Sequence, residues 1–274
     1  MFTLNCKGRL LVIAQPIVMG IINTTPDSFY SGSRQQSVDG ALKKAGEMIG
    51  EGATILDIGG QSTRPGSTPL TVKEELIRVM PIIAAIHRQF PDCFISVDTY
   101  YTKVAREAVE HGASLVNDIS GGSFDLAMPA TIASLHVPYI CMHVKGPVKT
   151  MHENPVYDNV TQEVLDYFIQ KMTDCTQAGI KDIIIDPGFG FSKNSAHNFQ
   201  LLKSLEVFQM LKRPLLLGVS RKSSIYKTLG IPIEESLNGT TVLHTAGLLK
   251  GANILRVHDV KEAMEAIALT GYLR

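Results

Sequence analysis

The chain has 274 residues, of which 45% are hydrophobic and 19% are charged, and its 26 basic residues are balanced by 26 acidic ones. This composition is typical of a folded globular protein and excludes disorder as the main state. A chain without a basic excess is a poor candidate for binding nucleic acid or an anionic membrane surface.

The four cysteines, Cys6, Cys93, Cys141 and Cys175, lie far apart and form no C-x-x-C pair. Neither a zinc ribbon nor a redox motif is therefore indicated, and free thiols in a reducing compartment are the expected state. The longest apolar stretch, residues 10–22, is shorter than the ~20 residues that a membrane-spanning helix needs. We therefore expect a cytoplasmic protein without a signal peptide or a membrane span.

Eight short apolar runs recur along the chain, each bounded by polar residues or glycine. Their apolar residues are continuous rather than alternating, which is typical of parallel strands buried on both faces. We expect strands at residues 17–23, 53–59, 93–98, 114–118, 138–143, 182–186, 214–220 and 253–258.

Helical patterns fill the gaps between these runs, most clearly at residues 38–50, 72–88, 161–177 and 233–250. Helices often end at a glycine, because glycine adopts the left-handed conformation without steric cost. Glycines follow helical patterns and precede strands at Gly52, Gly112, Gly179 and Gly251. The order strand, helix, glycine, strand is therefore repeated along the chain.

This repetition predicts an α/β fold, a single (β/α)8 TIM barrel that spans residues 1–274. Residues 1–16 precede the first strand, and we expect them to form a short hairpin or lid over the bottom of the barrel. An open doubly wound sheet would have the same alternation of elements. No glycine-rich dinucleotide fingerprint follows the first strand, which argues against that alternative.

Nearly every predicted strand ends in a residue that can form hydrogen bonds. In a barrel these ends meet at one mouth, where active sites lie. Any single one of them has an ordinary explanation as a helix cap or turn former. The strand-end residues are Asn23, Asp57, Asp98, Asn117, Asp118, His143, Asp186, Ser220, Arg221, Lys222, Arg256 and His258.

The mixture of groups suits a planar heterocycle that carries both donors and acceptors. Asp98 and Asp186 can each accept two parallel N–H bonds, Asn117 can donate and accept, and Lys222 can donate to a ring carbonyl or imine nitrogen. A second group could bind an anion, since arginine offers a fork to phosphate and histidine titrates near neutral pH. This group comprises Asn23, Arg64, Arg256 and His258.

The sequence contains no metal-ligand cluster, although one magnesium ion held by Asn23 and substrate phosphates would be chemically reasonable. Two loops, residues 23–32 and 59–66, are rich in glycine, proline and small hydroxyl residues, as mobile lids and ordinary surface loops both are. The glycines at residues 188 and 190 permit close backbone approach, and Phe191 could flank a ring.

Seven segments in this order resemble the dihydropteroate synthases, a family of pterin-binding enzymes, from about residue 17 to the C-terminus. The segments are MGIINTTPDSF (19–29), DIGGQSTRPG (57–66), SVDT (96–99), VNDI (116–119), DPGFGF (186–191), GVSRK (218–222) and RVH (256–258). The chain departs from the family pattern in the first loop and at residues 143–146 and 192–194, where no side chain assigned to chemistry is lost.

The resemblance implies condensation of 6-hydroxymethyl-7,8-dihydropterin pyrophosphate with 4-aminobenzoate, which gives 7,8-dihydropteroate and pyrophosphate for folate synthesis. It also implies inhibition by sulfonamides, use of Mg²⁺ and a homodimer.

The resemblance also assigns the site residues. The pterin would be held by Asp98, Asn117, Met142, Asp186, Phe191, Lys222 and Arg256. The 4-aminobenzoate would be held by Phe29, Thr63, Arg64, Pro65, Ser220 and Lys222. The pyrophosphate would be held by Asn23, Arg64, Arg256 and His258, with the metal at Asn23, and chemistry would fall to Asp98, Lys222, Arg256 and His258.

Two other functions remain open from the sequence. A methyltetrahydrofolate-dependent methyltransferase shares the barrel and the pterin-binding edge, but would not need both the Thr63-Arg64-Pro65 loop and residues 220–222. A catalytically inactive pterin-binding barrel would be expected to lose anion-binding or loop residues, which are present here.

Overall fold

The structure, a computed structural model, describes residues 1–24, 34–61, 68–147 and 155–273. Its strands are β1 (Phe2–Cys6), β2 (Arg9–Ile13), β3 (Ile17–Asn23), β4 (Ile55–Gly59), β5 (Phe94–Asp98), β6 (Leu115–Asp118), β7 (Tyr139–Met142), β8 (Ile183–Asp186), β9 (Leu216–Leu217) and β10 (Ile254–Val257). Its α-helices are α1 (Arg34–Gly50), α2 (Val72–Gln89), α3 (Thr102–Glu110), α4 (Met128–Leu135), α5 (Val160–Gln177), α6 (Ser195–Lys203), α7 (Ser223–Leu229), α8 (Leu237–Leu249) and α9 (Val260–Thr270).

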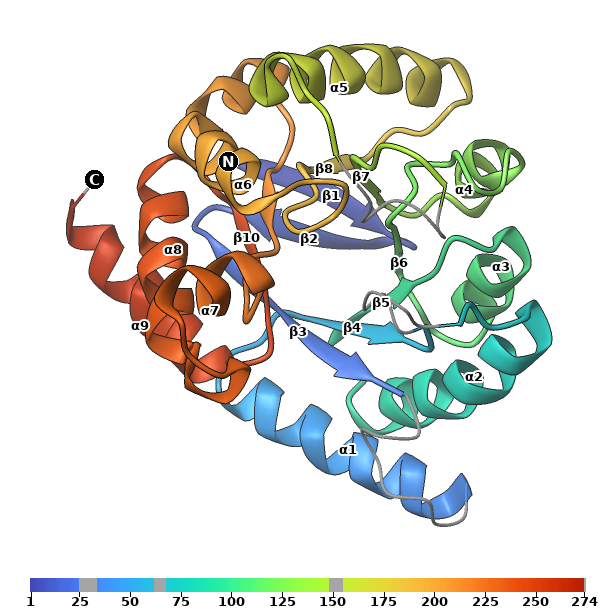
Figure 1. The fold of residues 1–274 in the computed structure, drawn as a ribbon. Helices are drawn as coiled ribbons and strands as arrows, with labels where there is room; N and C mark the ends of the chain where they lie inside the picture. The colour runs from blue at the N-terminus through green and yellow to red at the C-terminus, as the bar shows by residue number, and fades with distance from the viewer. Residues whose placement is uncertain (25–33, 62–67, 148–154, 274) are drawn as a thin grey trace.

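The eight strands from β3 to β10 form one parallel sheet in the order β8-β7-β6-β5-β4-β3-β10-β9. A parallel bridge between Ile185 and Leu215 joins its two ends, and the N–H of Ile185 donates to the carbonyl oxygen of Pro214 at 3.0 Å. The sheet is therefore closed into a barrel, with the helices in a ring around it (Figure 1). The predicted TIM barrel is confirmed, and the open-sheet alternative is wrong.

Alternate residues of each strand point to opposite sides of the barrel wall. In β3, Val18 and Ile22 pack in the large core between strands and helices, whereas Met19 packs inside the barrel. The inside layer is apolar at the bottom and consists of Met19, Ile55, Leu115, Ile140, Ile184, Leu216 and Ile254. The same sides of the strands carry the polar residues further along, toward the mouth.

The antiparallel hairpin β1–β2 closes the bottom of the barrel. Its inward residues Leu4, Cys6, Leu11 and Ile13 are buried against the inside apolar layer. Its outward residues alternate with them and are mostly exposed, as expected for a sheet with one face toward water. The expected N-terminal hairpin is therefore confirmed, and it seals the end opposite the mouth.

The predicted strands and helices agree with the structure to within a few residues, with two exceptions. The strand expected at 214–220 is only Leu216–Leu217, because the chain turns away after it and Arg221 adopts a positive φ of 53°. The helix expected at 233–250 is divided into a 3-10 turn, Ile233–Glu235, and α8. All four predicted stop glycines have positive φ values, between 94° and 119°.

All four cysteines are free thiols. Among the residues that the structure describes, no helix is long and apolar enough to cross a membrane.

Candidate active site

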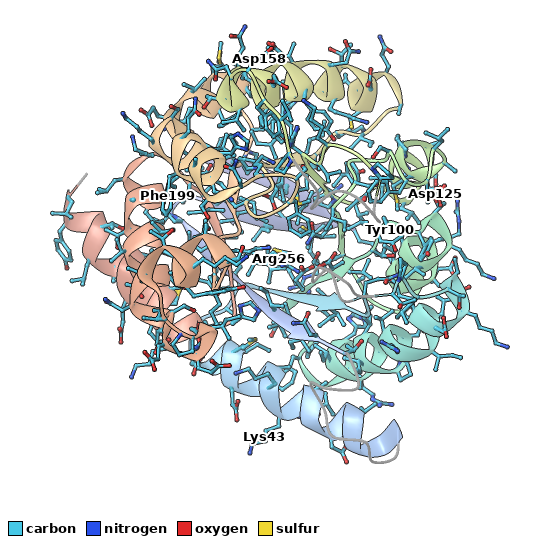
Figure 2. The ribbon with its side chains drawn as sticks, viewed as in Figure 1. Lys43, Tyr100, Asp125, Asp158, Phe199 and Arg256 are labelled. Carbon is cyan, nitrogen blue, oxygen red and sulfur yellow. The ribbon has the colours of Figure 1, made fainter. Side chains whose placement is uncertain are left out.

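The polar strand ends meet at the mouth of the barrel, where β10 supplies the central side chain, Arg256. In the view of Figure 2, Arg256 lies near the middle of the ring of strands. Its Nε donates to Asp57 Oδ2 of β4 at 2.7 Å, and its Nη2 donates to Asp98 Oδ2 of β5 at 2.6 Å. One guanidinium therefore connects three strands that are far apart in sequence.

Burial alone would lower the pKa of Arg256, but the charges of Asp57 and Asp98 outweigh it and raise the pKa. Asp98 shows the opposite balance, because burial raises its pKa and Arg256 only partly offsets that rise. The ionised form of Asp98 therefore depends on the charge of Arg256 beside it. Arginine itself stays charged at any physiological pH.

Asp57 is fully buried and serves two neighbours with one oxygen. Besides the bond from Arg256, its Oδ2 accepts a hydrogen bond from Nδ2 of Asn117 on β6 at 2.9 Å. The amide nitrogen of Asn117 therefore points to Asp57, which leaves the amide oxygen for a ligand. The other oxygen of Asp57, Oδ1, is buried without a partner among the described residues.

Asp186 ends β8 and is buried, with its Oδ1 accepting a hydrogen bond from the N–H of Gly188 at 2.8 Å. Burial raises the pKa of Asp186, whereas the Gly188 N–H and the charges of Arg256 and Lys222 lower it. The carboxylate thus depends on its cationic neighbours to remain ionised.

Lys222 follows β9, and its Nζ lies 4.3 Å from the centre of the Phe191 ring. Gly190 leaves room for it, since a Cβ there would lie 3.1 Å from Cδ of Lys222. Burial and the nearby Arg256 charge lower the pKa of Lys222 to about 8. Its ammonium is therefore closer to losing its proton at neutral pH than that of an exposed lysine.

Ser220 and His258 form a pair beside these charges. Oγ of Ser220 lies 3.0 Å from Nδ1 of His258 and accepts a hydrogen bond from the backbone N–H of His258 at 3.2 Å. Burial and the Arg256 charge lower the pKa of His258 to about 4, so the ring is neutral at pH 7. It is therefore a neutral donor or acceptor rather than a cation.

The apolar walls of the mouth come from a small cluster that contains Tyr100, Ile119, Met142 and Phe191. Met142 ends β7 and is buried, as is Phe191 in the loop after β8. Asn23 ends β3 and is half-buried. A cavity of about 390 Å³ lies beside the mouth and is lined by Ile21, Ile22, Asn23, Gly40, Lys43, Lys44 and Glu47. Asn23 belongs to both, whereas Asp57, Asp98 and Asp186 do not line the cavity.

Three of the strand-end residues make other contacts instead, one of them in its own turn and two with residues distant in sequence. Asp118 accepts four hydrogen bonds, from Ser120 N and Oγ, Gly122 N and Tyr139 Oη, at 2.7 to 2.8 Å, and so builds the turn after β6. Arg221 points away from the mouth and makes a two-bond ion pair with Asp259 at 2.8 Å. His143 is buried against Lys193.

The structure thus brings together Asn23, Asp98, Asn117, Met142, Asp186, Phe191, Ser220, Lys222, Arg256 and His258 at the mouth. Phe29, Thr63, Arg64 and Pro65 lie outside the described residues. Among the described residues, no group of three or more His, Cys, Asp or Glu side chains is arranged to hold a metal ion.

Two residues were missed by the sequence analysis. Asp57 was recognised as a strand end but given no role, although its position inside the second motif was a usable signal. Lys193 was noted only as part of a departure from the family pattern. Its burial depends on the fold, and no local pattern indicates it.

Chemically, the mouth offers carboxylate acceptors, an amide oxygen, an ammonium and a guanidinium between apolar walls. This set matches an amino-substituted, electron-rich heterocycle, whose N–H groups meet the carboxylates and whose ring carbonyl meets the ammonium. The unused N–H groups of the guanidinium can also bind an anion next to that ring.

Comparison with known proteins gives consistent matches. The model of the family described as "Pterin binding enzyme" matches residues 19–258. A dihydropteroate synthase of Escherichia coli strain K12 is 46% identical over 266 residues, which cover 96% of this chain and 94% of that protein.

Solved structures of dihydropteroate synthases are also similar to this chain. A dihydropteroate synthase of Xanthomonas albilineans with 4-aminobenzoic acid is similar with a TM-score of 0.92 and 39% identity, covering 99% of this chain and 97% of that chain. A Yersinia pestis dihydropteroate synthase with a sulfonamide drug complex is similar with a TM-score of 0.92 and 39% identity, covering 100% and 99%.

Proposed function

The chain belongs to the pterin-binding enzymes and, within them, to the dihydropteroate synthases, and from this premise we propose how its barrel mouth carries out the reaction. The enzyme transfers a pterinylmethyl group: it condenses 6-hydroxymethyl-7,8-dihydropterin pyrophosphate with 4-aminobenzoate to 7,8-dihydropteroate, in folate biosynthesis. None of the proteins compared above is a methyltransferase, so that alternative has no support from them.

The pterin subsite consists of Asp98, Asn117, Asp186 and Lys222, with Met142 and Phe191 as walls and Arg256 over the ring. The observation that supports this assignment most is the network in which Arg256 bonds Asp57 and Asp98 while Asp57 bonds Asn117. It holds groups of four strands, β4, β5, β6 and β10, in fixed orientations before a ligand arrives. Such preorganisation reduces the free energy that a ligand must spend on ordering its site.

The reaction breaks the bond between the pterin methylene carbon and the pyrophosphate oxygen, and the bonding pair leaves with pyrophosphate. The methylene cation that remains is delocalised into the dihydropterin ring, and the Asp98 carboxylate stabilises it. The amine nitrogen of 4-aminobenzoate then forms the new bond and loses a proton to solvent. Because this arylamine is a weak neutral nucleophile, exclusion of competing water favours product formation, and we propose this role for residues 23–32 and 59–66, most of which lie outside the described residues.

Negative charge on the departing pyrophosphate meets Arg256, His258 and Asn23. Two N–H groups of Arg256 are used by Asp57 and Asp98, so the others are available to phosphate oxygens. His258 is neutral at pH 7 because burial lowers its pKa to about 4, so it donates a hydrogen bond rather than a full charge. Arg64 completes this subsite, and Phe29, Thr63, Arg64, Pro65 and Ser220 with Lys222 hold 4-aminobenzoate.

Mg²⁺ is the proposed cofactor, with Asn23 as its protein ligand. Asp57 and Asp98 are engaged with Arg256 and Asp186 with the N–H of Gly188, whereas Asn23 is the half-buried last residue of β3, on the strand's inward side. One amide oxygen with phosphate oxygens and water is a donor set that suits magnesium, which keeps most of its water. When bound, the ion would neutralise charge on pyrophosphate.

An assay of pyrophosphate release tests this function with the whole chain. Dihydropterin pyrophosphate, 4-aminobenzoate and Mg²⁺ together should give pyrophosphate and dihydropteroate in equal amounts, and chelation of Mg²⁺ should abolish the reaction. Pyrophosphate released without 4-aminobenzoate supports bond cleavage before attack. Wild-type protein that yields no dihydropteroate contradicts the proposal.

Asp186→Asn should weaken pterin binding roughly ten- to hundredfold, because loss of a charged hydrogen bond costs ~1.5–3 kcal/mol. Calorimetry with 6-hydroxymethylpterin measures the affinity. Asp174→Asn, a change of the same kind on the exposed side of α5, is the control and should leave the affinity unchanged. Equal affinities of the Asp186 variant and wild type would remove Asp186 from the pterin subsite.

A further inference from the structure

Lys193 is a buried cation that the reaction described above does not use. It lies between β8 and α6, and its residue is only 7% exposed. Its Nζ lies 2.9 Å from Nδ1 of His143 and donates to the carbonyl oxygens of Gly188 and Phe191, both at 3.1 Å. An ammonium has three N–H groups, so these three acceptors use all of them.

Burial removes the ammonium of Lys193 from water, which disfavours its charged form. Burial lowers the pKa of Lys193 to about 7, although the nearby Asp186 charge acts in the opposite direction. Burial and the Lys193 charge lower the pKa of His143 to about 2, so its ring is neutral and Nδ1 can accept. Since an apolar side chain would fill this space without the cost, the contacts of the ammonium indicate what it does.

Those contacts converge on the loop after β8, residues 187–191. The N–H of Gly188 donates to Oδ1 of Asp186 at 2.8 Å, and the N–H of Phe191 donates to the carbonyl oxygen of Gly188 at 3.2 Å. The Phe191 ring in turn lies against Nζ of Lys222. Lys193 therefore holds both ends of the turn that orients Asp186 and Phe191.

The same turn is enclosed on its other sides. Gly188 has a φ of 73°, and a Cβ at this position would lie 2.1 Å from the carbonyl oxygen of His143. The N–H of Gly190 donates to Oδ1 of Asn198 on α6 at 2.9 Å. The loop thus has no room to shift toward β7, and Lys193 supplies the polar contacts beneath it.

We propose that Lys193 is a positioning residue of the pterin subsite, which acts through the loop at residues 187–191 on Asp186 and Phe191. It does not touch the reacting atoms. This inference rests on the proposed function, in which Asp186 and Phe191 contact the pterin and not 4-aminobenzoate.

The test compares Lys193→Met, which keeps the apolar stem and removes all three donors, with wild type. Lys250→Met is the matched control, since it removes an exposed ion pair with Glu206 at 2.8 Å on the surface. We expect Lys193→Met to weaken binding of 6-hydroxymethylpterin at least tenfold in calorimetry and to raise KM for the pterin pyrophosphate by a similar factor. We expect kcat and KM for 4-aminobenzoate to stay within twofold, and the control to match wild type throughout.

Pterin affinity within twofold of wild type would overturn the proposal, and so would equal changes for both substrates, which indicate a general loss of structure. If Lys193→Met does not fold, Lys193→Gln replaces it, since its amide can still donate to two of the three acceptors. It should give an intermediate pterin affinity, and wild-type affinity would overturn the proposal. Failure of the proposed function would give a different result from failure of the Lys193 proposal, because wild type and Lys250→Met would then also lack activity.

Discussion

Lys222 shows at the scale of one residue how burial sets the chemistry of the mouth. Its ammonium lies against Phe191 and feels the positive charge of Arg256, and burial together with that charge lowers its pKa to about 8. The proposed role of Lys222, donation to the pterin and to 4-aminobenzoate, needs the protonated form. Activity should therefore depend on its titration.

We expect kcat/KM for the pterin pyrophosphate to fall as the pH rises through about 8, because Lys222 then loses its proton. Lys222→Arg, whatever its absolute rate, should lack the part of this decrease centred near pH 8, since arginine stays charged, while a decrease centred near pH 7 would belong to Lys193. Rate profiles between pH 6 and about 10 check this. A decrease of the same form in the arginine variant would show that another group is responsible.

The same pKa affects stability with the opposite sign. The unfolded chain, in which Lys222 has its ordinary pKa of 10.5, binds more protons than the folded chain between about pH 8 and 10.5. The contribution of Lys222 to the free energy of unfolding therefore rises with pH across this window. Activity and this part of the stability thus change in opposite directions.

Among the elements, most barrel strands have an apolar start and a polar end on the inward side, with β7, which ends in Met142, as an exception. In β4, Ile55 belongs to the inside apolar layer, and two residues later Asp57 belongs to the mouth. In β10, Ile254 and Arg256 repeat this arrangement. Because the period of a strand is two residues, the bottom of the barrel supplies stability while the mouth carries the charges.

The hairpin extends this division, and its leucines at positions 4 and 10, one buried and one exposed, allow a matched test. Leu4→Ala removes a side chain that is 3% exposed beneath the barrel, and should lower the free energy of unfolding by about 2–5 kcal/mol. Leu10→Ala changes a residue that is 66% exposed, and should alter it by no more than about 0.5 kcal/mol. Urea unfolding measures both values.

Both hairpin variants should keep the pterin affinity of wild type when folded, because the hairpin lies at the end opposite the mouth. Equal stabilities of the two variants would contradict the packing of the hairpin against the barrel. Loss of pterin binding in a folded Leu4→Ala protein would contradict the division of the barrel into a stabilising bottom and a functional mouth.

At the scale of the whole molecule, closure of the sheet gathers the site and leaves the helices outside. On that outer surface, α8 and α9 pack side by side (Figure 1), and both carry exposed apolar residues. These include Val242 and Leu249 on α8 and Leu269 on α9. The sequence resemblance implies a homodimer, and we propose that this face pairs with a second copy of the chain.

Sedimentation velocity at micromolar concentration should therefore give the mass of a dimer. Val242→Glu, at a residue that is 58% exposed, should shift the protein to a monomer without changing its circular dichroism, because the new charge would be buried between two copies. A wild-type monomer would contradict the dimer, and a dimeric Val242→Glu variant would place the interface elsewhere.

The amino-acid sequence is enough to predict the succession of strands and helices, the hairpin and the strand-end positions of Asp98, Asn117, Asp186 and Arg256. These follow from apolar runs and glycine stops, which are local, and from the rule that parallel strands end at one mouth. The seven motifs also allowed the family to be predicted, because both their residues and their order can be read directly from the sequence.

Which strand-end residues face the mouth and which bond within their own turns is visible only in the folded barrel. Asp118 and Asp57 look alike in sequence, yet one builds a turn and the other joins Asn117, 60 residues away, to Arg256, 199 residues away. Lys193 likewise meets His143 across 50 residues. Such contacts depend on the direction in which each side chain points after the barrel closes, and no local pattern of residues encodes that direction.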